Sequence, residues 1–313
     1  MAVYRWIGGL AALVLGVLLA LTPALASSLE DGDAESQYQE NAWNFVDISM
    51  DTSAGIPDDA TGALADIREA GVLRVATEPY FAPQEFIDPD LEGQDGYAGA
   101  DMALARLIAQ RMGVALQIVA MDFTEVLRAV GDGTCDLAIS ALSYTPGRAA
   151  QVTFSKGYYY ADVRAGSALM IRAADSGRIT GVDSLVGRNI AAQSGSLQEA
   201  QMYENVFHYR EFRRMGSIQA LYDALMDGTV DAVMVDAQTG HAYIEGNPRC
   251  GLMLVPGARF TLEPQFEGDR IAAKKGEGQL IAFVNGVIDE VLASGQYMEW
   301  YEEASRRANT LGL

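Results

Sequence analysis

Cysteine and histidine are scarce, with two of each in a chain of 313 residues. Cys135 and Cys250 lie in separate segments, so we expect two buried, unpaired thiols, although an exported protein could form a disulfide. His208 and His241 are also far apart, and neither has neighbours at the spacing of zinc ligands. The sequence therefore predicts no metal site and no cofactor.

Basic residues are few as well. Lysine and arginine number 22 against 42 aspartates and glutamates, which gives a formal charge of −20. Arg5 is the only charged residue among the first 26, so residues 27–313 carry −21. A field of this sign repels phosphate backbones and anionic lipids. We expect no nucleic-acid partner.

Several catalytic motifs are also missing. The chain has no Gly-x-Ser-x-Gly elbow, no phosphate-binding Gly-rich loop and no triad context around either histidine. These absences favour a binding protein over an enzyme.

A continuous apolar run occurs near the start, from Leu10 to Leu21. It follows Arg5 and precedes Ala24-Leu25-Ala26, an arrangement typical of a secretory signal peptide cleaved after Ala26. The alternative is an uncleaved anchor, but the run is shorter than the roughly 20 residues that span a bilayer. No cysteine follows the exit, so a lipid-attachment motif is absent. We expect export, with residues 1–26 removed.

Residues 27–60 form an acidic leader. Residues 27–61 contain nine acidic residues and no basic one. A segment of this composition can remain disordered. Alternatively, its apolar residues, Trp43, Phe45, Val46 and Ile48, dock on the folded body, which is expected to begin near Thr61.

The remaining residues alternate between helical and strand patterns, which predicts mostly parallel sheets covered on both faces. Glycines end several of these elements, and Asp183 is expected to cap a short turn that ends at Gly187. Helices are predicted over 62–70, 98–112, 124–130, 196–204, 217–226 and 278–307, and strands over 72–77, 116–121, 137–142, 189–193 and 230–235.

One phrase occurs twice, as DGTCDLAIS at 132–140 and DGTVDAVMV at 227–235. Each copy reads as a helix end, where glycine supplies a left-handed turn, followed by a buried parallel strand. Two copies predict two similar α/β lobes. Ligands of such sheets lie beyond the carboxyl ends of the strands, so the residues after each copy should face a shared cleft.

After the first copy, Thr145-Pro146 reads as a helix start that holds Arg148 on a rigid turn. A guanidinium held in this way can bind a carboxylate with two hydrogen bonds. The alternative for any single arginine is an ordinary surface ion pair.

Two features belong to the other lobe. Residues 196–199, SLQE, form a capping box, and such a helix start offers free N–H groups to an anion. Asp236 follows the second copy, where its carboxylate could hold an ammonium group. Alternatively, each residue merely caps a helix. Together with Arg148, they describe a site for the two ends of a zwitterion.

Five stretches carry a family resemblance. They are LRVATEPYFAPQEF (73–86), GYAGADMALARLIAQRMG (96–113), CDLAISALSYTPGRAAQVTFS (135–155), IAAQSGSLQE (190–199) and DAVMVD (231–236). In order and spacing, from about Thr61 to Ala308, the chain resembles the polar amino-acid family of ABC-transporter solute-binding proteins. The resemblance implies a two-lobed periplasmic-binding-protein (Venus-flytrap) α/β fold, each lobe a mostly parallel sheet flanked by helices.

The resemblance also implies domain boundaries. Lobe 1 comprises residues 61–161 plus 262–313, and lobe 2 comprises residues 162–261. The chain crosses between them near Tyr158–Val163 and Phe260–Phe266, and a hinge there closes the lobes on a ligand. We interpret the tyrosines at 158–160 as packing of this connection and not as ligand contacts.

By the same resemblance, specific residues hold the ligand. Arg148 binds the α-carboxylate with help from Ser143 and the backbone around Ser196 and Leu197. Asp236 binds the α-ammonium, with the backbone near Ser140 and Ala141 in reach. Three further residues match positions around the ligand's side chain: Glu78, which favours polar or cationic groups, and the aromatic Phe81 and Phe123. For Phe123, core packing is an equal alternative.

Two positions depart from the family pattern. Leu197 stands where the family usually has threonine, and Gln84 stands where an aromatic residue is usual. Both departures suggest an altered specificity.

The implied function is capture of an amino acid or similar small zwitterion by a monomer in the periplasm, and its delivery to the membrane permease of an ABC transporter. One alternative is an enzyme on the same scaffold, similar to cyclohexadienyl dehydratases, with Glu199 or Glu78 as general acid. A second is a sensory or accessory periplasmic binding protein.

Overall fold

The computed structural model describes residues 45–160, 166–261 and 267–313, all within one compact unit that spans residues 34–313. The predicted signal peptide, Trp43 and most of the two predicted lobe connections lie outside the described residues. None of the described helices is both long and apolar enough to span a bilayer.

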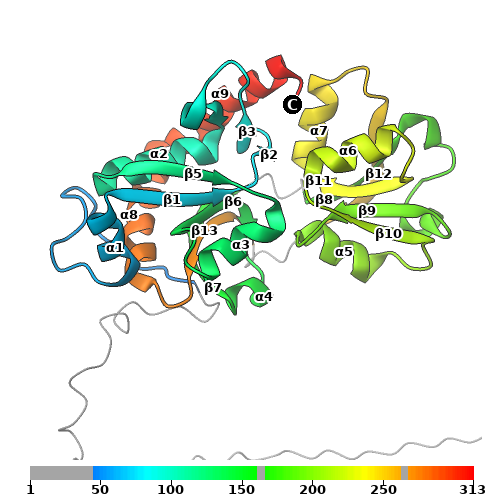
Figure 1. Ribbon diagram of the computed structural model, residues 1–313. Coiled ribbons are helices and arrows are strands. Elements are labelled where there is room, and N and C mark those ends of the chain that lie inside the picture. The colour runs from blue at the N-terminus through cyan, green and yellow to red at the C-terminus, as the bar shows by residue number, and fades with distance from the viewer. Residues whose placement is uncertain (1–44, 161–165, 262–266) are drawn as a thin grey trace, which may run out of the picture. The chain divides into compact units, whose positions relative to one another are not determined.

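The first of two five-stranded sheets has the order β5-β1-β6-β13-β7 (Figure 1). Its strands are β1 (Val72–Thr77), β5 (Ala115–Ala120), β6 (Leu137–Ser143), β7 (Val152–Tyr159) and β13 (Asp269–Lys274). The first three strands along the sheet are parallel, whereas β13 runs against its neighbours. A small antiparallel sheet, β2 (Tyr80–Phe81), β3 (Glu85–Ile87) and β4 (Tyr97–Ala98), follows β1 in the chain.

Helices cover both faces of this first sheet because its strands carry apolar residues on each face. Leu73 and Val75 join the core cluster shared with α1, α2 and α8, while Ala76 points to the cluster shared with α3. The helices of this half are α1 (Gly62–Ala70), α2 (Ala100–Met112), α3 (Phe123–Gly131), α4 (Pro146–Ala149), α8 (Gly278–Ser294) and α9 (Gln296–Leu311).

The second sheet repeats the plan in the order β10-β9-β11-β8-β12. Its strands are β8 (Ser167–Arg172), β9 (Asn189–Gln193), β10 (Glu211–Met215), β11 (Ala232–Asp236) and β12 (Leu252–Phe260), and its helices are α5 (Leu197–Asn205), α6 (Ile218–Met226) and α7 (Ala237–Gly246). Again three neighbouring strands are parallel and the next, β8, is reversed. The predicted pair of similar α/β halves is present.

The repeated phrase forms the same turn in both halves. The glycine that follows Asp132 has a φ of 78°, and the glycine that follows Asp227 has a φ of 80°. In each turn an aspartate Oδ1 accepts the backbone N–H two residues on, from Thr134 at 3.0 Å and from Thr229 at 2.7 Å. The left-handed helix ends that the sequence predicts are therefore confirmed.

The second aspartate of the phrase joins neighbouring strands. Asp136, just before β6, accepts the backbone N–H of Arg74 on β1 at 2.8 Å. Asp231, just before β11, accepts the backbone N–H of Asn189 on β9 at 2.9 Å. In each half, the repeated sequence thus ends a helix and bonds the central strand of the sheet to a neighbouring strand.

Two local predictions are wrong. The short turn near Asp183 is a 3₁₀ helix over Val182–Leu185, which begins after Gly181, so Asp183 lies inside the turn instead of capping it. Cys135 and Cys250 are both free, as predicted, but Cys250 is only half-buried. It follows the end of α7 and lies beside the core of the second half without entering it.

Residues 45–52, here called the N-terminal strap, pack on the first half. The side chain of Val46 is fully buried, and its N–H donates to the Phe154 carbonyl at 2.9 Å. The Asn285 side-chain amide donates to the carbonyls of Val46 and Ile48, at 2.8 and 2.9 Å. Ordered structure therefore begins well before Thr61, because these apolar residues find a surface on β7 and α8.

Gly286 makes this packing possible. A Cβ on Gly286 would lie 2.1 Å from the Met50 carbonyl oxygen, whereas a Cβ on Gly131 would meet nothing within 4 Å. Alanine normally stabilises a helix interior by up to about 1 kcal/mol over glycine. We expect Gly286→Ala instead to lower the free energy of unfolding by about 1–3 kcal/mol, because the strap must move. Denaturant unfolding measures this.

Gly131→Ala is the matched control and should be neutral or stabilising. An equal response of the two variants would show that the strap does not depend on close approach at Gly286.

Candidate functional site

All ten residues that the sequence analysis assigned to a ligand site line one cavity of about 80 Å³. They come from both halves of the described chain. The first half contributes residues that follow β1, β6 and the start of α3, and the second half contributes the start of α5 and the end of β11. Their contacts with a ligand stay a prediction.

Arg148 is buried in the wall of this cavity, with 9% of its surface exposed. Thr145 caps the one-turn helix α4 as predicted, and its hydroxyl accepts the Arg148 N–H at 3.2 Å. The guanidinium donates to the Ser143 carbonyl at 2.7 Å and to the Gly195 carbonyl of the other half at 2.9 Å. Its central carbon also lies 5.4 Å from the centre of the Phe123 ring.

No ion pair in the described part of the chain includes Arg148. Burial therefore lowers the pKa of Arg148 to about 10, since no carboxylate compensates the lost hydration. This argues against the alternative of an ordinary surface ion pair. A buried guanidinium without an acidic partner is costly, and an anion in the cavity would relieve that cost.

Helix α5 begins beside Arg148. The Ser196 hydroxyl accepts the Glu199 N–H at 3.0 Å, as a cap should. The predicted return bond is shifted by one residue, because Glu199 accepts the N–H of Gly195 at 2.6 Å and not that of Ser196. Glu199 also forms an ion pair with Arg214. The N–H groups of the first turn, around Leu197, lie at the cavity.

Asp236 both caps α7 and lines the cavity. Its Oδ1 accepts the N–H groups of Gln238 and Thr239, each at 2.9 Å. Burial raises the pKa of Asp236, although these cap bonds oppose the rise. The two interpretations left open by the sequence are therefore compatible, since one carboxylate can cap the helix and face a cationic group.

Glu78 follows β1 and is almost fully buried. Its N–H donates to the Ser140 hydroxyl at 3.1 Å, while its carboxylate Oε1 has no hydrogen-bond partner among the described residues. Burial raises the pKa of Glu78 to about 7, although hydrogen bonds from the Gln193 side chain and the Ile218 backbone lower it. A carboxylate oxygen without a partner in a cavity suits a polar or cationic group.

The two aromatic candidates occupy different settings. Phe81 on β2 packs against the core cluster of the second half, although it belongs to the first. Phe123, the first residue of α3, packs on a core cluster of its own half. Both are half-buried and line the cavity, so for Phe123 core packing and cavity lining coexist.

Ser140, Ala141 and Ser143 lie on the last residues of β6. Ala141 has a φ of 45°, a left-handed backbone unusual for a residue with a Cβ, and its N–H donates to Asp101 at 2.9 Å. The Ser140 hydroxyl donates to Glu85 at 3.0 Å. This local distortion bends the strand where it meets the cavity.

A buried acid pair supports these residues. Burial raises the pKa of Glu85 well above its ordinary value, and the charge of the buried Asp101 raises it further. Asp101 also accepts the hydroxyls of Tyr158 at 2.7 Å and Tyr297 at 2.6 Å. Of the three consecutive tyrosines, Tyr158 thus belongs to the core, as expected.

Tyr159 differs from that interpretation because it lines the cavity. Its ring stacks on Tyr301 at 4.8 Å between centres, and its hydroxyl accepts the Gln238 amide at 2.9 Å. Gln238 also donates to the Tyr301 hydroxyl at 2.5 Å. These bonds join α7 of the second half to β7 and α9 of the first.

Seven further residues line the cavity but were not recognised from the sequence as ligand candidates. They are Gln84, Glu85, Tyr159, Gln193, Gln198, Gln238 and Asp269. Asp269 was missed because β13 is reversed. Its first residue therefore lies at the sheet edge where the parallel strands end, paired with Ser143 and Tyr159. Gln84 carried a signal, since it replaces an aromatic residue.

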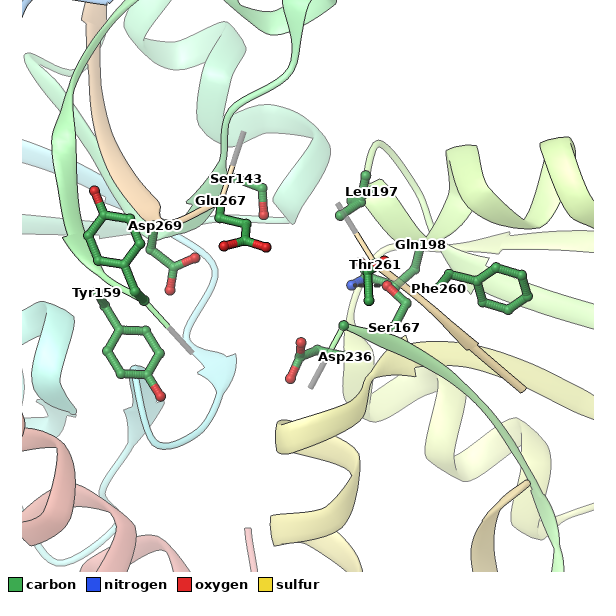
Figure 2. Close-up of a pocket in the computed structure, with 13 residues that line it drawn as sticks. Ser143, Tyr159, Ser167, Leu197, Gln198, Asp236, Phe260, Thr261, Glu267 and Asp269 are labelled. Atoms are coloured by element: carbon green, nitrogen blue, oxygen red, sulfur yellow. Dashed lines mark hydrogen bonds between the residues drawn. The ribbon is translucent and has the colours of Figure 1, made fainter. Parts of the chain in front are cut away.

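A second cavity of about 110 Å³ adjoins the first and shares Asp236 and Asp269 with it. Figure 2 shows the carboxylates of Asp236, Glu267 and Asp269 directed into this space from its two sides. Across residues 45–160, 166–261 and 267–313, no three His, Cys, Asp or Glu side chains cluster closely enough to hold a metal ion.

The sequence of the chain matches a family model, that of the bacterial extracellular solute-binding proteins, family 3, over residues 73–304. The chain belongs to this family. Its two α/β halves correspond to the two lobes of these proteins, and the family fold predicted from the sequence is confirmed.

Individual family members are similar over most of their length. The arginine-binding extracellular protein ArtP of Bacillus subtilis is 26% identical over 203 residues, which cover 64% of this chain and 75% of ArtP. A substrate-binding protein of an amino-acid ABC transporter from Streptococcus pneumoniae, AbpA, was solved bound to L-arginine. It superposes with a TM-score of 0.68 at 29% identity, covering 78% of this chain and 98% of AbpA.

At least two relatives are named as enzymes, a cyclohexadienyl dehydratase and a lytic murein transglycosylase. The cyclohexadienyl dehydratase of Pseudomonas aeruginosa is 26% identical over 173 residues, which cover 55% of this chain and 61% of the dehydratase. Proteins similar to this chain therefore include both binding proteins and proteins named as enzymes.

Proposed function

We propose that this solute-binding protein captures an amino acid between its two lobes and delivers it to an ABC transporter. The buried, unpaired guanidinium of Arg148 carries the proposal, because it provides a site for an α-carboxylate. Asp236 lines the same cavity and would hold the α-ammonium. The N–H groups at the start of α5 add further donors for the carboxylate.

The ligand's side chain is proposed to be cationic. Glu78 offers an unpartnered carboxylate oxygen, and Phe81 and Phe123 flank the same cavity. Aromatic faces and a carboxylate together suit a guanidinium or ammonium group. The names of ArtP and AbpA's bound L-arginine support this class of ligand.

The remaining features of the proposal concern the protein's setting. The chain would act as a monomer in the periplasm after removal of residues 1–26, with a membrane permease as its partner. Lobe 1 would comprise residues 61–161 and 262–313, lobe 2 residues 162–261, and closure would occur at the two connections. The family's extracellular character supports this setting.

Binding without catalysis is preferred over a dehydratase activity. Glu199, one candidate general acid, is bound by the Gly195 N–H and by Arg214, which leaves it poorly placed to transfer a proton. Glu78 has the raised pKa of an acid catalyst, so a dehydratase remains the second candidate. A sensory role would share the same cavity and is distinguished by its membrane partner.

Isothermal titration with L-arginine and L-glutamine tests the proposal. We expect L-arginine to bind, and its affinity to fall by on the order of tenfold per pH unit below pH 7, because Glu78 must lose its proton first. The stability of the ligand-free protein should change in the opposite direction and fall as the pH rises. The pKa of Glu78 is higher in the folded than in the unfolded chain, so its contribution to stability is lost as pH rises from about 4 to 7.

Glu78→Gln should remove most of the difference in pH dependence between the two ligands. Absence of binding for every amino acid would overturn the proposal. Turnover of a prephenate-like or arogenate-like compound, followed as product over time, would instead favour the dehydratase.

A further inference from the structure

The amine end of the proposed site contains more acceptors than Asp236 alone. Asp269 begins β13 and lines the same cavity, where the sheet places it beside Ser143 and Tyr159. Asp269 and Asp236 lie on opposite sides of the adjoining space in Figure 2, and each directs its carboxylate into it. They come from different halves of the chain, and the negative charge of Asp236 disfavours a second negative charge on Asp269.

Gln84 supplies an independent observation. Its side chain is 5% exposed and lines the cavity, and its Oε1 has no hydrogen-bond partner among the described residues. The same side chain hydrogen-bonds to the Asp269 carboxylate, for which only its amide nitrogen can be the donor. A buried acceptor without a donor is costly, so the site is incomplete without a group that carries N–H or O–H.

Charge in the cavity points the same way. Among the described residues that line it, the ionisable groups at neutral pH are four carboxyls and one guanidinium, namely Glu78, Glu85, Asp236, Asp269 and Arg148. Glu85 accepts the Ser140 hydroxyl at 3.0 Å, and the charges of Asp101 and Glu78 disfavour a further charge on it. An amino acid whose carboxylate meets Arg148 and whose side-chain cation meets Glu78 therefore leaves both Asp236 and Asp269 for its ammonium.

We propose that Asp236, Asp269 and Gln84 form a three-acceptor site for the α-ammonium of the ligand. This inference rests on the proposed function and narrows it. An –NH₃⁺ group has three donors, one for each acceptor. A quaternary ammonium has none and is recognised by aromatic faces instead. The site therefore selects primary amines and rejects betaine-like ligands in which the nitrogen is fully methylated.

Binding at this site is expected to change the pKa of Asp269. Burial raises the pKa of Asp269 well above its ordinary value, and the charges of Asp101 and Asp236 raise it further. An ammonium beside Asp269 favours the charged carboxylate, so we expect this pKa to fall and protons to be released to solvent when the ligand binds. The titratable groups that face Asp269 are the carboxyls of Asp101, Asp236 and Glu267 and the hydroxyls of four tyrosines: Tyr158, Tyr159, Tyr297 and Tyr301.

The test compares Asp269→Asn with Asp66→Asn by titration calorimetry. Asp66→Asn is the matched control, because it makes the same replacement at an exposed residue of α1 that lines neither cavity. The probes are L-arginine and its α-deamino analogue, which lacks the ammonium. Titrations in phosphate and in Tris at pH 7 give the number of protons released.

We expect Asp269→Asn to weaken L-arginine about tenfold to a hundredfold, the usual effect of a hydrogen bond to a charged group. The α-deamino analogue should change less than about twofold, and proton release should fall. Asp66→Asn should leave the affinity for both ligands within about twofold of that of the unmodified protein. The Asn variant's ligand-free thermal midpoint should be unchanged or higher, since a buried acid is removed.

Equal weakening of both ligands, or no weakening of L-arginine, would overturn the three-acceptor site while leaving the proposed function intact. Failure of the unmodified protein to bind any amino acid would overturn the proposed function instead. Binding of glycine betaine as tight as that of L-arginine would contradict the inference directly.

Discussion

Replacing Arg148 with methionine should abolish measurable ligand binding. Methionine keeps much of the packing against Phe123 but removes the guanidinium that faces the cavity. Loss of one partner from a buried charge pair costs about 2–5 kcal/mol, or roughly 30-fold to several thousand-fold in affinity. Saturating ligand should therefore no longer raise the thermal midpoint of the variant.

The ligand-free Arg148→Met protein should be at least as stable as the unmodified one, because an unpaired buried charge is lost. Arg148→Lys should bind, but more weakly than the unmodified protein, because an ammonium cannot bind a carboxylate with two parallel bonds. Arg128→Met is the control, since Arg128 is an exposed residue paired with Glu125 and Asp132. Normal ligand-induced stabilisation in Arg148→Met would refute its assignment to the carboxylate.

Replacing Asp236 with asparagine should weaken binding by about 2–5 kcal/mol while leaving the fold intact. Asparagine is as good a helix cap as aspartate, so the Oδ1 bonds to the N–H groups of Gln238 and Thr239 can persist. The expected loss therefore reports the charge and not the end of α7. Calorimetric titration measures the affinity, and thermal unfolding checks the fold.

Asp227→Asn provides the corresponding control in the same half. Asp227 is exposed and accepts the Thr229 N–H, a bond that asparagine can also accept. This variant should bind ligand normally. If Asp236→Asn also kept full affinity, the ammonium would have to be held elsewhere in the cavity.

Much of the fold could be predicted from local signals. Glycines at 71, 113 and 295 end α1, α2 and α8 with left-handed backbones, as their positions after apolar helical stretches indicate. The parallel strands were recognisable as short apolar runs, two of which, β1 and β5, begin just after Gly71 and Gly113. Such signals depend only on neighbouring residues, so they can be recognised without knowing how each element packs in the fold.

The reversed strands could not be predicted in the same way. β8 and β13 follow the connections between the halves, and their direction depends on where the chain enters each sheet. An apolar run has the same pattern in either direction. The rule that ligands meet the carboxyl ends of strands therefore missed Asp269, the first residue of a reversed strand.

Some residues of the candidate site also carry a local sequence signal, whereas others do not. Arg148, Ser196 and Asp236 occupy helix starts or strand ends with recognisable chemistry, and all three line the cavity. Glu85 and Tyr159 gave no such signal, because their position depends on tertiary packing. Burial argues against a surface ion pair for Arg148, one of the two alternatives that the sequence left open, and its role in a ligand site stays a prediction.

The twin aspartates of the repeated phrase have a mechanical consequence. Asp136 ties β6 to β1, and Asp231 ties β11 to β9, so each tie stays within its own sheet. A rotation of one half relative to the other would break none of these bonds. If closure changes the distance between Arg148 and Asp236, each sheet would keep its internal bonds, and the cost of the motion would fall on the contacts between the two halves, such as the bond from Arg148 to the Gly195 carbonyl.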